Sequence, residues 1–231
     1  MTADLARVEP CASSRPYQPR TLTLAEMKSC DVHSYRSPTE GMRLMSVVGI
    51  PAIAQLLLLD FEPNIVAIVE RPRVLRAGSR SYEISFWCCE RDGRERMLLL
   101  VPSSESTRNG NGRRYHREAE ALIDAAKEAQ LPLEFVHASE LRAHEHRIAL
   151  AYRLLPLVQT AHRLSNRLVL SNAILDVLVR FHRVRFSQLT AALDGYAAAD
   201  VHCVLADLLH RGMVVSDAAD RLLRSTNFEK A

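Results

Sequence analysis

The chain has 231 residues, of which 48% are hydrophobic and 25% charged, and its formal net charge at pH 7 is +3. This length allows one or two domains of about 100–200 residues each, with the composition of a soluble globular protein. So small an excess of positive charge does not by itself indicate a nucleic-acid partner.

The cysteines are five in number and scattered, and no Cys-x-x-Cys pair occurs. Cys88 and Cys89 are adjacent, so in a strand they would point to opposite faces. This usage indicates a reducing cytosol without structural zinc. No long apolar run stands near the N-terminus, and the apolar segment 47–59 is too short to span a bilayer. We therefore expect a cytoplasmic protein with no membrane segment.

The chain begins with a polar, proline-containing segment, 1–22, which we expect to be disordered on its own. Thr23, followed three residues later by Glu26, is typical of a capping box at the start of a short helix. A loop is then expected at 31–41, and a strand at 42–48.

The most apolar helix expected in the chain covers 50–59. Gly49 precedes it, and Pro51 stands in its first turn, where the missing N–H of proline leaves no hydrogen bond unmade. Gln55 is the only polar residue of the run, so we expect this helix to be buried on every side. Residues 60–63, Asp-Phe-Glu-Pro, end it.

Three β-strands are predicted after this helix, at 64–75, 82–89 and 97–101. The first is rich in isoleucine and valine, which suits a strand. A turn at 77–80 separates the first two strands, and the Asp-Gly pair within 91–94 is typical of a β-hairpin.

This stretch resembles the nuclease domain of the TnsA family of transposon endonucleases, which has a restriction-enzyme-like fold. The family shows an apolar helix with a Phe-acidic-Pro end, a strand ending in Glu-x-Pro, an aromatic residue after the metal-binding Asp, and a Gly-Arg turn before an apolar strand. The matching residues are Leu58 to Pro63, Glu70-Arg71-Pro72, Ser85-Phe86, Gly93-Arg94 and 97–101. The resemblance implies an α/β fold with a restriction-endonuclease-like mixed sheet flanked by helices, followed by a mostly helical winged-helix domain.

The positions at which the family holds its catalytic residues carry other residue types here. The resemblance implies the catalytic Glu at Ala52, the metal-binding Asp at Ser85, and the Glu and Lys of Glu-x-Lys at Leu100 and Pro102. Two-metal hydrolysis needs carboxylates that hold hard cations against a phosphate, which these side chains cannot do. The resemblance therefore implies the fold without the catalytic residues, and we expect no metal site and no cofactor.

The segment 103–114 contains no apolar residue and is predicted to be a loop. In an active family member this end of the sheet lies near the scissile phosphate. Arg108, Arg113, Arg114 and Arg117 are therefore candidate contacts to a DNA backbone. A charged loop that is merely solvated is the other interpretation, and both stay open.

Further along the chain we expect a helix at 117–129, a strand at 132–136, and a helix capped by Ser139 that runs to about 159. The order helix, strand, helix again matches the TnsA-like pattern. The apolar periodicity breaks around 160–167, which separates a nuclease-like domain, 23–160, from a second domain, 166–231.

The second domain has the outline of a winged helix: three helices and a hairpin. Ser187 is expected to cap the second helix, and Gly212 to end the third. The hairpin is predicted from 213–215 and 221–225, with a turn at 217–220. In the TnsA family this region contacts the transposition ATPase as well as DNA.

The third helix of such a domain normally enters the major groove. Here it carries Asp200, His202, Asp207, His210 and Arg211, and is not basic, so base reading by it is doubtful. Several arginines nearby suit phosphate contacts better. They are Arg180, Arg183, Arg185, Arg221 and Arg224. A protein-docking domain is an equal alternative.

Our leading hypothesis is a catalytically inactive, TnsA-like accessory protein of DNA transposition or integration. Its expected partners are DNA, a transposase and an AAA+ ATPase, and the sequence leaves the oligomeric state open. One alternative is a winged-helix transcription regulator. The other is an active endonuclease whose metal ligands have migrated. The nearest carboxylates are Asp60, Glu62, Glu83, Glu90 and Asp92.

Overall fold

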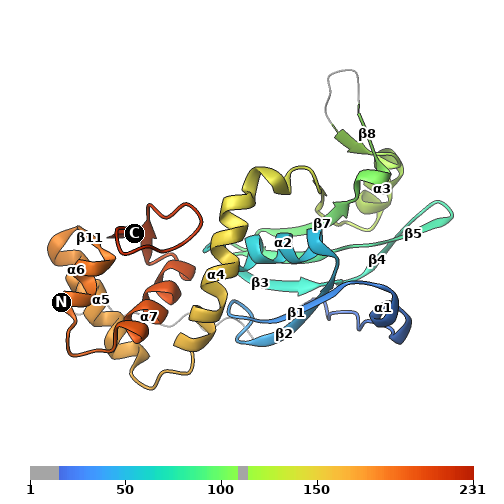
Figure 1. Ribbon diagram of the computed structural model, residues 1–231. Helices are drawn as coiled ribbons and strands as arrows, with labels where there is room; N and C mark the ends of the chain where they lie inside the picture. The colour runs from blue at the N-terminus through green and yellow to red at the C-terminus, as the bar shows by residue number, and fades with distance from the viewer. Residues whose placement is uncertain (1–15, 109–113) are drawn as a thin grey trace. The chain divides into compact units, whose positions relative to one another are not determined.

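The computed structural model of the chain describes residues 16–108 and 114–231 (Figure 1). By its internal contacts the chain divides into two units. The sheet unit holds the residues up to Val32 and Asn64–His137, and the helical unit holds His33–Pro63 and Ala138–Ala231. The domain limits predicted at 160 and 166 do not coincide with these units.

The sheet unit is built on four strands in the spatial order β10-β7-β6-β3. Their bounds are β3 (Ile65–Glu70), β6 (Phe86–Glu90), β7 (Glu95–Val101) and β10 (Leu133–His137). β3, β6 and β7 run antiparallel to one another, and β10 runs parallel to β7. Helix α3 (Ala119–Glu128) connects β7 to β10 and buries Leu122 and Ala126 in the core of this unit. This mixed sheet confirms the predicted α/β class.

The strands predicted at 64–75 and 82–89 are each interrupted. After β3, Arg71 adopts a left-handed conformation with φ of 52°, which breaks the extended backbone. The chain then forms a separate hairpin of β4 (Val74–Ala77) and β5 (Arg80–Glu83), with Gly78 in its turn. The prediction of two continuous strands, which was based on apolar content, is therefore wrong.

The loop predicted at 31–41 is also wrong. Most of it forms β1 (Val32–Ser37), which pairs with β2 (Arg43–Val48), the strand predicted at 42–48. Helix α1 (Leu24–Ser29) precedes them, and its predicted capping box is confirmed: Thr23 and Glu26 exchange hydrogen bonds.

The segment 103–114 is a loop only in part. A short 3-10 turn, η1 (Ser103–Glu105), leads into β8 (Ser106–Arg108), which pairs with β9 (Arg114–His116). Residues between these strands lie outside the described part of the chain.

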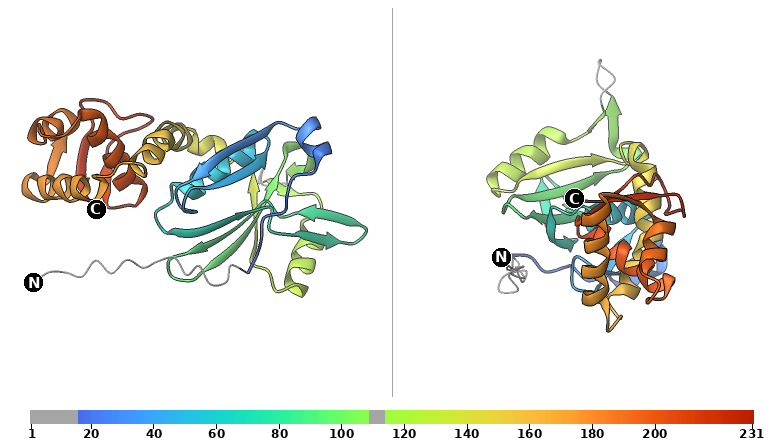
Figure 2. Two further views of the ribbon diagram at one scale, coloured as in Figure 1. Left: turned by 90° about the horizontal axis from the view of Figure 1, so that it is seen from below. Right: turned by 90° about the vertical axis from the view of Figure 1, so that its left-hand side faces the viewer.

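The helical unit contains five α-helices, a 3-10 turn and three short strands after β1 and β2 (Figures 1 and 2). The helical elements are α2 (Ile50–Asp60), η2 (Leu141–His144), α4 (Glu145–Ala161), α5 (Arg167–Phe181), α6 (Phe186–Ala192) and α7 (Ala198–His210). The strands are β11 (Arg183–Arg185), β12 (Val214–Ser216) and β13 (Asn227–Lys230), in the spatial order β11-β13-β12. From α5 onward this is the winged-helix arrangement.

Four sequence-based details of this unit are wrong. Ser187 does not cap α6 but lies within it, and Arg185 holds the N-cap position. Helix α2 is not buried on every side, because Ile50 is 70% exposed. Ser139 does not cap α4, which begins at Glu145 after η2. Residues 221–225 are not a strand; β13 begins only at Asn227, whose backbone and side-chain N–H groups donate to the Asp217 carboxylate at 2.9 and 2.6 Å.

None of the described helices has both the length and the apolar run that crossing a bilayer requires.

Candidate nucleic-acid interface

Two of the four positions at which the resemblance implies catalytic residues meet in the sheet unit. The backbone N–H of Leu100 donates to the hydroxyl of Ser85 at 3.0 Å. The backbone N–H of Ser85 in turn donates to the carbonyl of Leu98 at 2.9 Å. The side chain at position 85 is therefore used to complete the strand pairing between β6 and β7.

The other two positions carry no polar side chain. Ala52 is buried in α2 of the helical unit, and Pro102 is exposed just before η1. Neither residue can donate an electron pair to a metal from its side chain.

Two of the five alternative carboxylates lie in the helical unit, and each has a structural partner. The buried Asp60 accepts hydrogen bonds from the Ser37 hydroxyl at 2.9 Å and from the Thr39 N–H at 3.1 Å. Glu62 pairs with Arg147 at 3.1 Å. Both residues hold the end of α2 to its neighbours.

A third carboxylate, Glu83, belongs to an ion network that fastens α1 to the sheet unit. The guanidinium of Arg71 lies between Glu26, at 2.5 Å, and Glu83, at 2.9 Å. Arg20 pairs with Glu83 at 2.5 Å, and its backbone N–H donates to the carbonyl of Arg71 at 3.1 Å. Only 6% of the Arg71 side chain is exposed, whereas its partners remain partly open to water: Glu26 is 30% and Glu83 33% exposed.

The last two carboxylates stand at the turn between β6 and β7. Glu90 pairs with Arg96 at 3.6 Å, and Asp92 accepts the backbone N–H of Arg94 at 3.0 Å. Among residues 16–108 and 114–231, no three His, Cys, Asp or Glu side chains gather in a way that could hold a metal ion.

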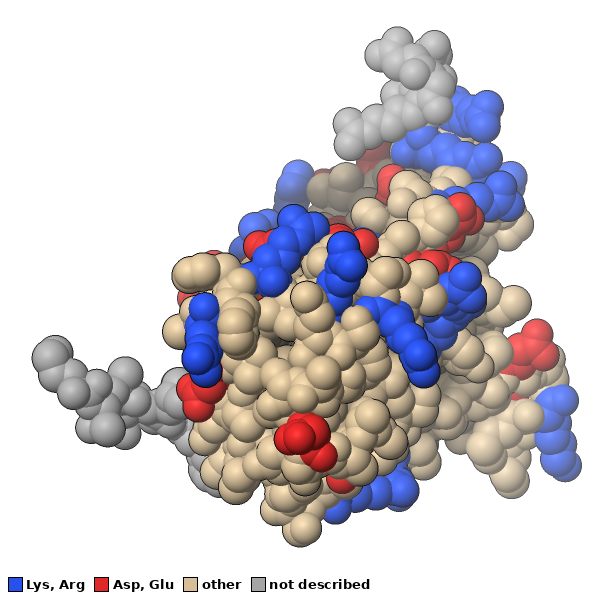
Figure 3. Space-filling view, turned by 60° about the vertical axis from the view of Figure 1, so that its left-hand side comes forward, with Lys and Arg blue, Asp and Glu red and all other residues tan. Residues whose placement is uncertain are grey.

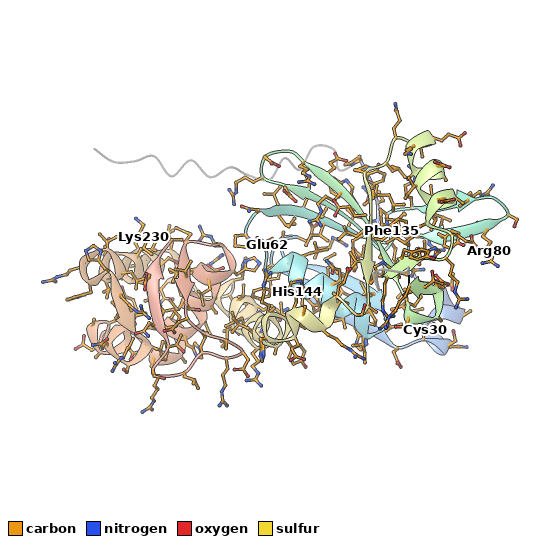
Figure 4. The ribbon with its side chains drawn as sticks, turned by 90° about the horizontal axis from the view of Figure 1, so that it is seen from above. Cys30, Glu62, Arg80, Phe135, His144 and Lys230 are labelled. Atoms are coloured by element: carbon orange, nitrogen blue, oxygen red, sulfur yellow. The ribbon has the colours of Figure 1, made fainter. Side chains whose placement is uncertain are left out.

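Two shallow hollows flank Arg80, which lies at the tip of the β4–β5 hairpin (Figure 4). The larger, of about 750 Å³, reaches Arg117 and the start of α3. The smaller, of about 400 Å³, reaches Leu100 and Glu105. Glu118 neutralises Arg80 at 2.6 Å, so these hollows carry charges of both signs.

The arginines predicted near this end of the sheet are partly brought together. Arg108 and Arg114 are cross-strand neighbours in the β8–β9 hairpin, and Arg117 follows directly. Arg114 donates to the Ser106 hydroxyl at 3.4 Å, whereas the side chains of Arg108 and Arg117 are exposed. Arg113 lies outside the described residues.

Two of the five arginines predicted in the winged helix are engaged within the protein. Arg183 pairs with Asp217 at 3.3 Å and with Glu229, its cross-strand neighbour, at 3.4 Å. The hydrogen bonds from Asn227, and then the contact with Arg183, hold the pKa of Asp217 below its usual value, so it is ionised at neutral pH. Arg180 stacks over the ring of Phe181 at 5.3 Å.

The remaining three, Arg185, Arg221 and Arg224, are exposed and form no ion pair with any described residue. The backbone of Arg224 contacts the segment that follows Arg185, because the Ser187 N–H donates to the Arg224 carbonyl at 3.2 Å, and Arg221 precedes Arg224 by three residues in the same loop. We call these three residues the arginine edge. Figure 3 shows a row of Lys and Arg side chains, with some Asp and Glu side chains among them, across the visible face.

Helix α7, the third helix of the winged-helix arrangement, is covered on its outer side. Ala206 and Leu209 on α7 pack against Leu154 and Val158 of α4, and α4 and α7 lie side by side (Figure 1). On the opposite face Val204, with its neighbours, enters the winged-helix core. Sequence reasoning found α7 unsuited to base reading from its charge but missed this burial.

Comparison with protein-family models finds no match for this chain, and comparison with curated proteins finds none either.

Proposed function

We propose that this chain is a non-cleaving, TnsA-like accessory protein of DNA transposition or integration, which binds DNA or the protein partners of that machinery. The expected protein partners are a transposase and an AAA+ ATPase. Support comes from the order of elements, in which helix α2, three antiparallel strands, helix α3 and a parallel fourth strand follow the restriction-endonuclease-like plan.

The observation that carries the proposal is the contact between Ser85 and Leu100. These two residues are neighbours, as the ligands of a metal site would have to be, yet one is a hydroxyl that accepts a backbone hydrogen bond and the other an apolar side chain. A scaffold of this kind retains the shape of the fold without groups that could hold cations against a phosphate.

The test is incubation of the purified protein with supercoiled plasmid and Mg²⁺ or Mn²⁺. We expect no nicking. Glu83→Ala and Asp60→Ala variants are the controls, because they remove two of the five carboxylates considered as migrated ligands. Nicking that survives repurification and disappears in either variant would sink the non-cleaving interpretation.

A second candidate, a winged-helix transcription regulator, has support in the arrangement from α5 to β13. A footprint confined to one operator sequence would favour it. The burial of α7 against α4 favours the first proposal instead.

A further inference from the structure

In winged-helix and helix-turn-helix proteins that read sequence, one helix presents a row of polar side chains to the base edges of the major groove. Helix α7 takes that place in the order of elements here. Whether it can read DNA depends on which of its residues reach solvent.

The outer face of α7 is occupied by α4. Ala206 is fully buried, and together with Leu209 it packs against Leu154 and Val158. A helix with apolar contacts on both sides behaves as a core helix. Withdrawing α4 would expose apolar surface and no row of hydrogen-bonding groups.

The end of α2 locks the C-terminal end of α7 in place. The ring of Phe61 meets the imidazole of His210 edge-on, with centroids 5.0 Å apart. Gly212 lies so close to Pro63 that a Cβ at this position would come within 2.6 Å of the proline ring. These contacts join the Phe-acidic-Pro motif to α7.

A buried ion pair adds a third attachment. Asp207 is fully buried and receives two hydrogen bonds from the guanidinium of Arg167, at 2.8 and 3.0 Å. Breaking such a pair leaves an uncompensated buried charge. Of the two acidic residues of α7, Asp207 is thus turned inward and neutralised, whereas Asp200, in the first turn, is half-buried.

We infer that α7 is a core helix and that the helical unit contacts duplex DNA of any sequence through the phosphates, along the arginine edge. The inference rests on the proposed function, and it names the substrate class of that DNA contact. Arg185, Arg221 and Arg224 are available because nothing described neutralises them, whereas Arg183 already binds Asp217 and Glu229. Contacts of this kind position a protein on DNA without reading its bases.

The first experiment measures binding of the full chain to two duplexes of equal length and unrelated sequence by fluorescence anisotropy over a range of salt. We expect equal affinity for both. The triple variant Arg185→Ala, Arg221→Ala, Arg224→Ala should weaken both alike. It should also reduce the slope of log K against log salt by about 0.9 for each phosphate that the protein no longer neutralises.

The matched control removes the same charge elsewhere. The triple variant Arg76→Ala, Arg142→Ala, Arg163→Ala changes three exposed arginines that lie outside the arginine edge. We expect it to leave the salt slope unchanged. Circular dichroism of both triple variants checks that the fold is retained.

The second experiment tests the burial of α7 without relying on DNA affinity. Ala206→Cys, at the α4 contact, should resist a maleimide with and without duplex, whereas Ala198→Cys, exposed in the first turn of the same helix, should react. Peptide mapping separates these sites from the native cysteines. Reaction at position 206 on adding DNA would overturn the inference, because α7 would then leave its cover.

Other outcomes of these experiments also test the inference or the proposed function. A preference for one duplex of more than about tenfold, or no effect of the arginine-edge variant, would overturn the inference and leave the non-cleaving function standing. The same holds if the wild-type chain binds neither duplex. Plasmid nicking would overturn the proposed function while leaving the burial of α7 untouched.

Discussion

Glu26 joins helix α1 to the sheet unit. Its carboxylate accepts the backbone N–H of Thr23 at 2.8 Å and lies 2.5 Å from the guanidinium of Arg71. The hydrogen bonds from Thr23, and then the charge of Arg71, hold the pKa of Glu26 at about 2, below its usual value of 4.5. The folded protein therefore favours the ionised form.

The Glu26→Gln variant should lose stability in a manner that depends on pH. Because the folded-state pKa is depressed, the contribution of this carboxylate is complete above about pH 4.5 and is lost as the pH falls toward 2. Urea unfolding should separate variant from wild type at pH 7, and the two curves should converge near pH 2. Glu128→Gln, at an exposed site, is the control. A difference between variant and wild type that is the same at both pH values would contradict this account.

The cysteines should differ sharply in reactivity. Burial raises the pKa of the Cys88 thiol to about 12, so almost none of it is thiolate at pH 8. Cys30 is exposed. Iodoacetamide at pH 8 should alkylate Cys30 and leave Cys88 unmodified until urea unfolds the chain. Mass spectrometry of the peptides checks this, and rapid native alkylation of Cys88 would show that β6 opens.

At the scale of single elements, the sequence predicted structure well where an element depends on contacts between residues that are close together in the chain. The capping box of α1, the proline-started α2, the turn at Gly93 and the helix end at Gly212 depend only on neighbouring residues, and the structure contains all of them. The errors came from longer-range effects. No local signal marks the left-handed backbone of Arg71, which hydrogen-bonds to Ser85, or the pairing of β1 with β2.

Gly212 combines two requirements at one position, a φ of +66° and a close approach to Pro63. Gly212→Ala should destabilise the protein by about 1–3 kcal/mol, because it adds backbone strain and a Cβ that meets a rigid ring. Gly195→Ala is a matched control, since nothing lies within 4 Å of a Cβ there and its φ is ordinary. Thermal unfolding of both variants checks the difference. Equal melting temperatures would mean that α2 and α7 are not tightly joined at this point.

At the scale of the whole molecule, part of the candidate site was readable from the sequence. The apolar and hydroxyl residues at 52, 85, 100 and 102 already excluded carboxylate ligands there. The sequence did not show which arginines are neutralised within the protein and which are available to contact DNA. Arg183 is neutralised by residues 34 and 46 positions further along the chain, and only the folded sheet brings them together. The cover over α7 likewise comes from residues about 50 positions earlier.

The helical unit should not survive division at the predicted domain limit. A fragment covering 166–231 lacks α4 and the end of α2, so the face of α7 around Ala206 would be open to water. At ~25 cal/mol per Å² of apolar surface, we expect this fragment to be less stable than the full chain by a few kcal/mol. Dye binding to exposed apolar surface and urea unfolding check this. A fragment as stable as the intact protein would support the limit at 160–166.

The contact between Thr39 and His210 joins residues 171 positions apart in one unit. A ribosome adds about 5–20 residues per second, so α2 is made about 5–20 s before α4, which covers it, is complete. During that interval Leu57, buried in the finished protein, has no α4 to shield it. The newly made chain would therefore be a substrate for chaperones that bind exposed apolar segments. A run of slowly translated codons after position 63 would lengthen the time for which these chaperones are needed.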